Sequence, residues 1–131
     1  MPMILIEIVN KYSEEQEIAL IKAVYSAVLE TFKVTPEAIN TRVMVHEPHR
    51  FSVPINCNPE QYVIVNIDCF SGRSLTTKRN LYHAIVNYLN ELARIPKDHI
   101  KIVLRESGRE NWGILGGIAG CDIDVGYNIE F

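Results

Sequence analysis

The chain opens with Met1-Pro2-Met3-Ile4-Leu5-Ile6-Glu7-Ile8, a proline that leads directly into an apolar stretch. Residues 3–9 are rich in Ile, Leu and Val, the composition of a buried strand. If Met1 is removed, Pro2 becomes the amino terminus and carries a free secondary amine on a rigid ring. A proline inside a chain has only an amide nitrogen, whereas this amine can act as a base, an acid or a nucleophile. The opening stretch therefore predicts a strand with a reactive group at its first residue.

Length and composition restrict the class of protein. With 131 residues, 47% of them hydrophobic, the chain is long enough for one domain with a substantial core. A net charge of −3 with scattered Lys and Arg argues against a nucleic-acid surface. No apolar run is long enough to span a membrane, and the short opening run contains Glu7, unlike a signal peptide. We expect a single cytoplasmic domain over residues 1–131 that binds neither nucleic acid nor membrane.

The cysteines and histidines have no metal-binding or disulfide pattern. The three cysteines are an odd number without C-x-x-C spacing, and the four histidines lack an H-E-x-x-H spacing. They are Cys57, Cys69, Cys121, His46, His49, His83 and His99. We therefore predict buried thiols and no metal site.

Two helices are predicted from caps and apolar periodicity. Ser13-Glu14-Glu15-Gln16 is a capping box, which predicts a helix that ends near Lys33, before Thr35-Pro36. After Ser71-Gly72-Arg73-Ser74, a second helix with an apolar face ends before Pro96.

The remaining strands are predicted from alternation and from runs of β-branched residues. We expect strands over 41–47 and 63–67 and a fourth from Ile100 to Arg105. Residues 48–60 hold three prolines and predict a loop or a ragged edge hairpin. The tail from Trp112 to Phe131 predicts a glycine-rich loop and a short closing strand.

The order strand, helix, proline, strand occurs twice, in halves of about 2–58 and 59–131. A right-handed crossover makes the strands of each half parallel. The expected fold class is α+β built from α/β-type βαβ units, a four-stranded mixed sheet with both helices on one face. The other face must be covered, which predicts a closed homo-oligomer.

These residues resemble the tautomerase superfamily, whose members use an N-terminal proline on a duplicated βαβ fold, and most of all its malonate semialdehyde decarboxylase-like branch. The resemblance rests on three groups of residues in order along the chain. They are Pro2, then Gly72-Arg73-Ser74 with Lys78 and Leu81-Tyr82, then Glu110-Asn111-Trp112-Gly113 with Gly116-Gly117. The resemblance implies a homotrimer, no metal, no organic cofactor, and Pro2 in a pocket near a subunit boundary.

Two positions depart from the decarboxylase pattern. The decarboxylase has an aspartate before strand two and a further arginine two positions before the matched arginine. The aligned residues are Ala38 and Ser71, although Glu37 is adjacent to the first. These departures argue against decarboxylation and hydration, because both need water or substrate activation beyond the amine.

Four side chains are candidates for the site. Pro2 and Arg73 are the expected catalytic residues, and Arg73 precedes the second helix, where a guanidinium and free backbone N–H groups would bind a carboxylate. Trp112 is either a substrate wall or a packing anchor, and His46 is a weaker substrate-binding candidate. A buried Pro2 amine beside Arg73 should have a pKa below that of an ordinary α-amine.

The sequence predicts proton transfer between carbon and oxygen of a small 2-oxo acid or enol carboxylate, an isomerase reaction. Decarboxylation or hydration of a semialdehyde or acetylenic acid is the alternative within enzymes, and a non-catalytic trimeric binding protein is the alternative outside them. Retention of Met1 would exclude both enzymes, because the amine would then be primary and displaced from Pro2.

Overall fold

The computed structural model describes residues 2–9 and 11–131. The two long helices are α1 and α2, and a short 3-10 turn, Pro36–Ala38, precedes the second strand. Along the chain the elements are β1 (Met3–Ile8), α1 (Glu14–Phe32), β2 (Asn40–Val45), β3 (Val63–Phe70), α2 (Leu75–Ala93), β4 (Ile100–Ser107), β5 (Gly113–Ile114) and β6 (Ile118–Ala119). Neither long helix in this described part is apolar enough to cross a membrane.

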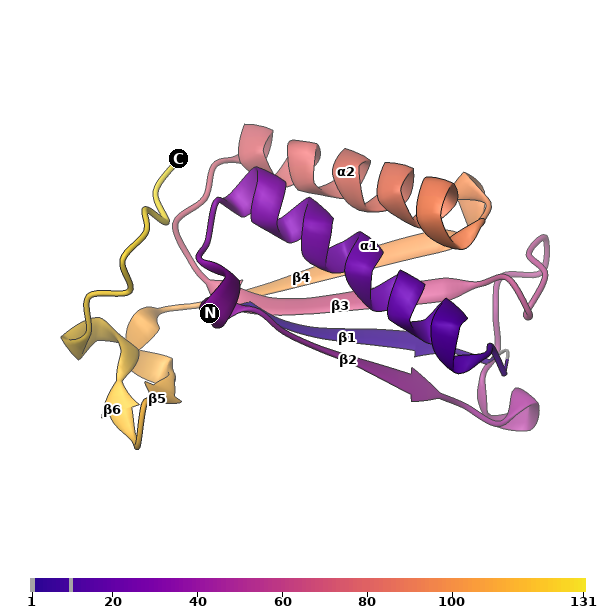
Figure 1. Cartoon of the computed structure of the whole chain (residues 1–131), viewed down its shortest axis with the longest axis horizontal. Coiled ribbons are helices and arrows are strands. Elements are labelled where there is room, and N and C mark those ends of the chain that lie inside the picture. Colours follow the sequence, from indigo (N-terminus) through magenta and orange to yellow (C-terminus); the bar gives the residue numbers. More distant parts are fainter. Residues whose placement is uncertain (1, 10) are drawn as a thin grey trace.

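The four long strands form one mixed sheet in the order β2-β1-β3-β4. β1 is parallel to β2 and antiparallel to β3, and β3 is parallel to β4. Both helices lie side by side on one face of this sheet (Figure 1). The predicted four-stranded mixed sheet with βαβ units is confirmed.

Local signals determine where the helices begin and end. The Ser13 hydroxyl accepts the Gln16 backbone N–H at 3.2 Å, and the Gln16 side chain accepts the Ser13 N–H at 2.8 Å, so the predicted capping box is present. α1 ends at Lys33, whose left-handed backbone (φ 52°) closes the last turn. α2 begins after Ser74, whose hydroxyl accepts the Thr77 N–H at 3.2 Å.

Strand alternation separates a core face from an open face. Ile4, Ile6 and Ile8 are buried beneath the helices, whereas Met3 on the opposite face is 40% exposed. No other element of the described chain is packed over that opposite face in Figure 1. The open face is therefore the part of the molecule that lacks a cover within one chain.

The tail differs from the predicted loop and single closing strand. Two strands of two residues each, β5 and β6, pair as a small hairpin, and residues 123–131 contain no strand. Gly116 and Gly117 form the turn of that hairpin with φ of 88° and 91°, a conformation in which glycine has no Cβ clash. The tail then runs back to α2, where the Phe131 oxygen accepts the Ser74 N–H at 2.9 Å and the Thr77 hydroxyl at 2.7 Å.

Candidate active site

Pro2 is buried at the first position of the sheet. Its carbonyl oxygen accepts the Asn40 N–H at 3.3 Å, which extends the β1–β2 pairing by one step. Met3 lies opposite Asp68, so continuation of that antiparallel register places Pro2 opposite Cys69. By alternation, Pro2 is on the same helix-covered face as Ile4. The Pro2 nitrogen thus belongs to the edge where β1 begins and β3 ends.

Arg73 lies at this same edge, between β3 and α2. Only 6% of its surface is exposed, and the guanidinium is 4.0 Å from the centre of the Phe32 ring at the end of α1. Its Nη1 donates a hydrogen bond to the Phe70 carbonyl oxygen at 3.3 Å. Burial lowers the pKa of the Arg73 guanidinium, and the neighbouring Cys69 and Tyr127 partly oppose that effect. The fold therefore holds a cation in its interior.

Arg73 forms no ion pair with an acidic side chain within the described residues, although Glu106 is near enough for its charge to act on the guanidinium. None of the ion pairs found there includes Arg73, and its Nε is buried without a hydrogen-bond acceptor. A buried charge with an unsatisfied donor is costly, so such groups are normally paired with a counter-ion. An external anion such as a substrate carboxylate would supply the missing acceptor.

Two backbone N–H groups at the start of α2 already have acceptors within the chain. The Ser74 N–H is bonded to Phe131, and the Thr77 N–H is bonded to the Ser74 hydroxyl. Lys78, one turn further on, is paired with Glu106 at 2.5 Å. The buried guanidinium of Arg73 remains the candidate anion-binding group at this edge, as the sequence predicts.

A cavity of about 170 Å³ lies at this end of the sheet, where the 3-10 turn Pro36–Ala38, the β5–β6 turn and the tail meet. It is lined by Thr35, Glu37, Ala38, Ile114, Leu115, Ile123, Asp124, Val125 and Tyr127. Ala38 is buried and precedes Asn40, the residue bonded to Pro2. The wall is mostly apolar with a few polar groups, as is usual for sites that bind small molecules.

Trp112 packs against the end of β3. Its ring meets the Phe70 ring edge-to-face with 5.3 Å between centres, and its Nε1 donates to the Ser107 hydroxyl at 2.9 Å. The described residues that line the cavity include Ile114 and Leu115 but not Trp112. Of the two readings of Trp112, this placement favours the packing anchor for the hairpin that carries those two side chains.

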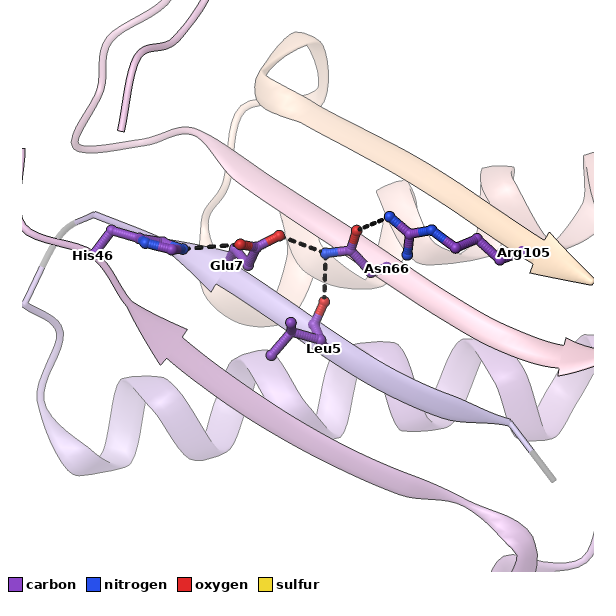
Figure 2. Close-up of polar contacts among 5 residues, drawn as sticks. All are labelled: Leu5, Glu7, His46, Asn66 and Arg105. Carbon is purple, nitrogen blue, oxygen red and sulfur yellow. Dashed lines mark hydrogen bonds and ion pairs between the residues drawn. The ribbon is translucent and has the colours of Figure 1, made fainter. Parts of the chain in front are cut away.

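His46 lies at the opposite end of the sheet from Pro2. The His46 backbone N–H donates to the Ile8 oxygen at 2.8 Å. Ile8 lies six residues after Pro2, a separation of roughly 20 Å along the strand at about 3.3 Å per residue. Figure 2 shows its ring against Glu7, with 2.9 Å between Nε2 and Oε1. Within one chain the structure does not bring His46 to Pro2 or Arg73.

Glu7 in turn connects His46 to a row of polar side chains across the open face of the sheet (Figure 2). Asn66 donates to Glu7 at 2.7 Å and to the Leu5 oxygen at 3.2 Å, and Arg105 donates to the Asn66 oxygen at 3.2 Å. His46 is part of this row, which links β2, β1, β3 and β4.

Two further residues were not identified from the sequence. Arg109 follows β4, donates to the Gly120 oxygen at 3.0 Å and to the Ile123 oxygen, and has its guanidinium 5.6 Å from the Phe70 ring centre. Tyr127, from the tail, lines the cavity and is half-buried. The only signals in the sequence were a tyrosine and an arginine within otherwise glycine-rich surroundings, which do not specify a site.

Within the described residues, no three His, Cys, Asp or Glu side chains gather in a way that could hold a metal ion. The described residues at this end of the sheet instead include Pro2, the buried guanidinium of Arg73, the phenol of Tyr127 and a partly apolar cavity.

The chain is similar in structure to several solved tautomerase-superfamily proteins. It superimposes on malonate semialdehyde decarboxylase with a TM-score of 0.81 at 18% identity, covering 89% of this chain and 93% of that one. For native fused 4-OT the TM-score is 0.83 at 13% identity, covering 92% and 98%. For Pt0534 inactivated by 2-oxo-3-pentynoate it is 0.83 at 18% identity, covering 92% and 97%. Other fused 4-OT structures are symmetric or asymmetric trimers.

A comparison with curated protein sequences finds no match. The sequence model of a family described as "Tautomerase enzyme" matches residues 39–115, more than half of the chain. This range includes Arg73 and the elements from β2 to β5, and the solved relatives share the fold over nearly the whole chain. The chain therefore belongs to the tautomerase family.

Proposed function

We propose that this protein is a tautomerase in which Pro2, exposed by removal of Met1, moves a proton between carbon and oxygen of a small 2-oxo acid or enol carboxylate. The observation that carries the proposal is the buried guanidinium of Arg73, which forms no ion pair with an acidic side chain among the described residues. It lies at the edge of the sheet where Pro2 begins β1. A substrate carboxylate on Arg73 would hold the reacting carbon and oxygen near the amine.

Keto–enol exchange needs one group that accepts and returns a proton, and one group that holds the substrate. Pro2 and Arg73 supply these two roles. The neutral amine takes the enol proton, the electron pair of the C=C bond forms the new C–H bond with that proton, and the C=O bond is completed. The amine ends neutral, so the cycle needs no further reactant.

The first experiment is intact-mass analysis followed by reaction with 2-oxo-3-pentynoate, the compound with which Pt0534 was inactivated. We expect the mass of the chain without Met1 and the addition of one equivalent per chain, which Pro2→Ala reduces. Wild-type protein should also ketonise phenylenolpyruvate. Retained Met1 together with no turnover would instead support a non-catalytic trimeric binding protein.

Arg73→Ala tests the substrate clamp. Loss of a charge-assisted hydrogen bond, worth roughly 1.5–3 kcal/mol, should lower kcat/KM about ten- to a hundredfold or somewhat more. Arg79→Ala is a matched control, because Arg79 is exposed on α2. Equal losses in the two variants would contradict the assignment of Arg73.

Decarboxylation or hydration is the second candidate, because Glu37 places a carboxylate on the cavity wall beside Ala38. In that case malonate semialdehyde would be consumed faster than any enol tested, and Glu37→Gln would abolish its consumption while leaving tautomerisation unchanged. We rank this candidate second because Ala38 and Ser71 occupy the positions at which the decarboxylase pattern has an aspartate and a second arginine.

A further inference from the structure

Tyr127 contributes the one phenol among the described residues that line the cavity. Its side chain is half-buried and packs against the hydrophobic core, and these packing contacts hold it in place. Two carboxylates, Glu37 and Asp124, lie on the same wall. An ionised carboxylate can only accept hydrogen bonds, whereas a phenol can donate one.

The tail that carries Tyr127 is fastened on both sides of that residue. On one side Arg109 holds the Gly120 and Ile123 oxygens. On the other, the Phe131 oxygen is bound by the first turn of α2. Such fixed ends keep a side chain near one place and lower the cost of ordering it when a substrate binds.

A local turn orients the backbone immediately before Tyr127. The Asp124 carboxylate accepts the Gly126 N–H at 2.9 Å, and Gly126 has φ of 78°. This turn reverses the tail so that Tyr127 reaches the cavity wall beside Asp124.

The electrostatic surroundings suit a hydrogen-bond donor. Burial raises the pKa of the Tyr127 phenol, while Arg73 and Arg109 are close enough for their charges to lower it in part. Because the net direction is upward, the phenol keeps its proton at neutral pH. The tail next to Tyr127 also approaches Arg73 directly, because a Cβ on the adjacent Gly72 would lie 2.9 Å from the Ile129 oxygen.

We propose that Tyr127 is a further catalytic residue, whose hydroxyl donates a hydrogen bond to the substrate oxygen that alternates between carbonyl and enol. The inference rests on the proposed function of Pro2 and Arg73. In a 2-oxo acid the oxo group and the carboxylate are on neighbouring carbons, so a donor close to Arg73 falls beside the oxo oxygen. While the proton is on Pro2, this oxygen carries the negative charge of an enolate, and Tyr127 stabilises it without giving up its own proton.

Tyr127→Phe, which removes only the hydroxyl, tests this role. We expect kcat for phenylenolpyruvate ketonisation to fall on the order of a hundredfold, the usual effect of losing one donor to an oxyanion. KM should change less than about threefold, because Arg73 still binds the carboxylate. Labelling of Pro2 by 2-oxo-3-pentynoate should still reach one equivalent per chain.

Tyr88→Phe is the matched control. Its hydroxyl interacts with Glu30 on the helical side of the molecule, away from the cavity at the end of the sheet. This variant should keep the wild-type kcat, KM and labelling.

The outcomes separate the inference from the function on which it rests. Wild-type protein without turnover and without labelling overturns the proposed function. An active wild type, with Tyr127→Phe retaining kcat within threefold, overturns only the role of Tyr127. A parallel loss of labelling and kcat in Tyr127→Phe also overturns it, because a packing defect would affect both.

If Tyr127→Phe does not fold, as judged by circular dichroism, wild-type protein with ¹³C at the tyrosine Cζ atoms decides the question. Addition of pyruvate should shift the assigned Tyr127 signal and leave the Tyr88 signal in place. An unchanged Tyr127 signal at saturating pyruvate would overturn the proposal.

Discussion

At the scale of single residues, Arg73 carries a charge that the described fold leaves without an ion pair to an acidic side chain. The fold gives the guanidinium a ring face from Phe32 and one backbone acceptor, Phe70. These contacts replace only part of the hydration that burial removes. A group kept at such a cost in stability is typical of a functional site.

Arg73→Met should therefore separate stability from function. The apolar side chain fills similar space without the desolvation cost, so we expect the free energy of unfolding to be unchanged or to rise by about 1 kcal/mol. At the same time kcat/KM should fall at least about tenfold. Urea denaturation and steady-state kinetics measure the two effects, with Arg79→Met as an exposed control. A marked loss of stability would show that Arg73 is structural.

Of the three thiols predicted to be buried, only Cys69 is buried, whereas Cys57 is half-buried and Cys121 is exposed. Cys69 should be unreactive although it lies opposite Pro2. Burial raises the pKa of its thiol from 9.0 to about 11, so almost no thiolate is present at neutral pH. Iodoacetamide at pH 7.5 should modify the exposed Cys121 but leave Cys69 intact until denaturant is added. Peptide mass spectrometry distinguishes the two sites. Equal modification rates for Cys69 and Cys121 in native protein would contradict the prediction.

The raised pKa of the Cys69 thiol makes the stability of the fold depend on pH. The folded state holds the Cys69 proton more tightly than the unfolded state does. Its contribution to stability is therefore complete below pH 9.0 and is lost as the pH rises toward 11. Cys69→Ala should lack this alkaline component of the unfolding free energy.

At the scale of elements, Gly72 allows the tail to pack closely against the start of α2. This glycine has φ of 140°, and a Cβ there would lie 2.9 Å from the Ile129 oxygen. The close approach lets residues 129–131 run along the start of α2, where Phe131 is bound. The shape of the candidate site thus depends on a contact between segments far apart in sequence.

Gly72→Ala should cost about 1–3 kcal/mol, because it combines a rare backbone conformation with a clash against the tail. Gly126→Ala also has a positive φ, of 78°, but its Cβ would point into open space, so we expect a smaller loss. Chemical denaturation compares the two variants. Equal losses would mean that backbone strain alone, and not the tail contact, makes Gly72 necessary.

At the scale of the whole molecule, the open face of the sheet calls for a partner. Met3 and Met44 are 40% and 45% exposed on that face, beside the polar row that ends at Arg105. Fused 4-OT relatives with the same fold are trimers. We propose that three copies of this chain cover one another's open faces.

Met44→Asp should weaken this assembly, because it places a charge in the apolar contact. Light scattering after size exclusion should give three times the chain mass for wild-type protein and a smaller mass for the variant. Ile18→Asp is the control, since Ile18 is 57% exposed on α1. A wild-type monomer at micromolar concentration would contradict the prediction.

The sequence by itself determined the elements of the sheet and the helices that cover it. The Ile-, Leu- and Val-rich composition of residues 3–9, the capping box at Ser13 and the prolines that follow each helix are local signals, so they predicted β1, α1 and the order of both halves closely. The right-handed crossover predicted two parallel strand pairs in one mixed sheet, and the structure adds their order, β2-β1-β3-β4. Pro2 and Arg73 were selected from their places at the ends of such elements and from the family resemblance, and their catalytic roles stay predictions.

Only the tertiary structure decided what gathers at the end of the sheet where Pro2 and Arg73 lie, although neither of these two residues lines the cavity there. Contacts between distant segments determine the position of Tyr127, the cavity, and the hydrogen bonds from Arg109 to the tail. One such contact is the hydrogen bond from Thr77 to Phe131, 54 residues apart. The tail has no periodicity, because its backbone conformation comes from glycines and from these contacts and not from burying a regular face. His46 directly follows β2, which is parallel to β1, so the predicted crossover already implies its place at the far end of the sheet. Only the structure shows its contact with Glu7 there.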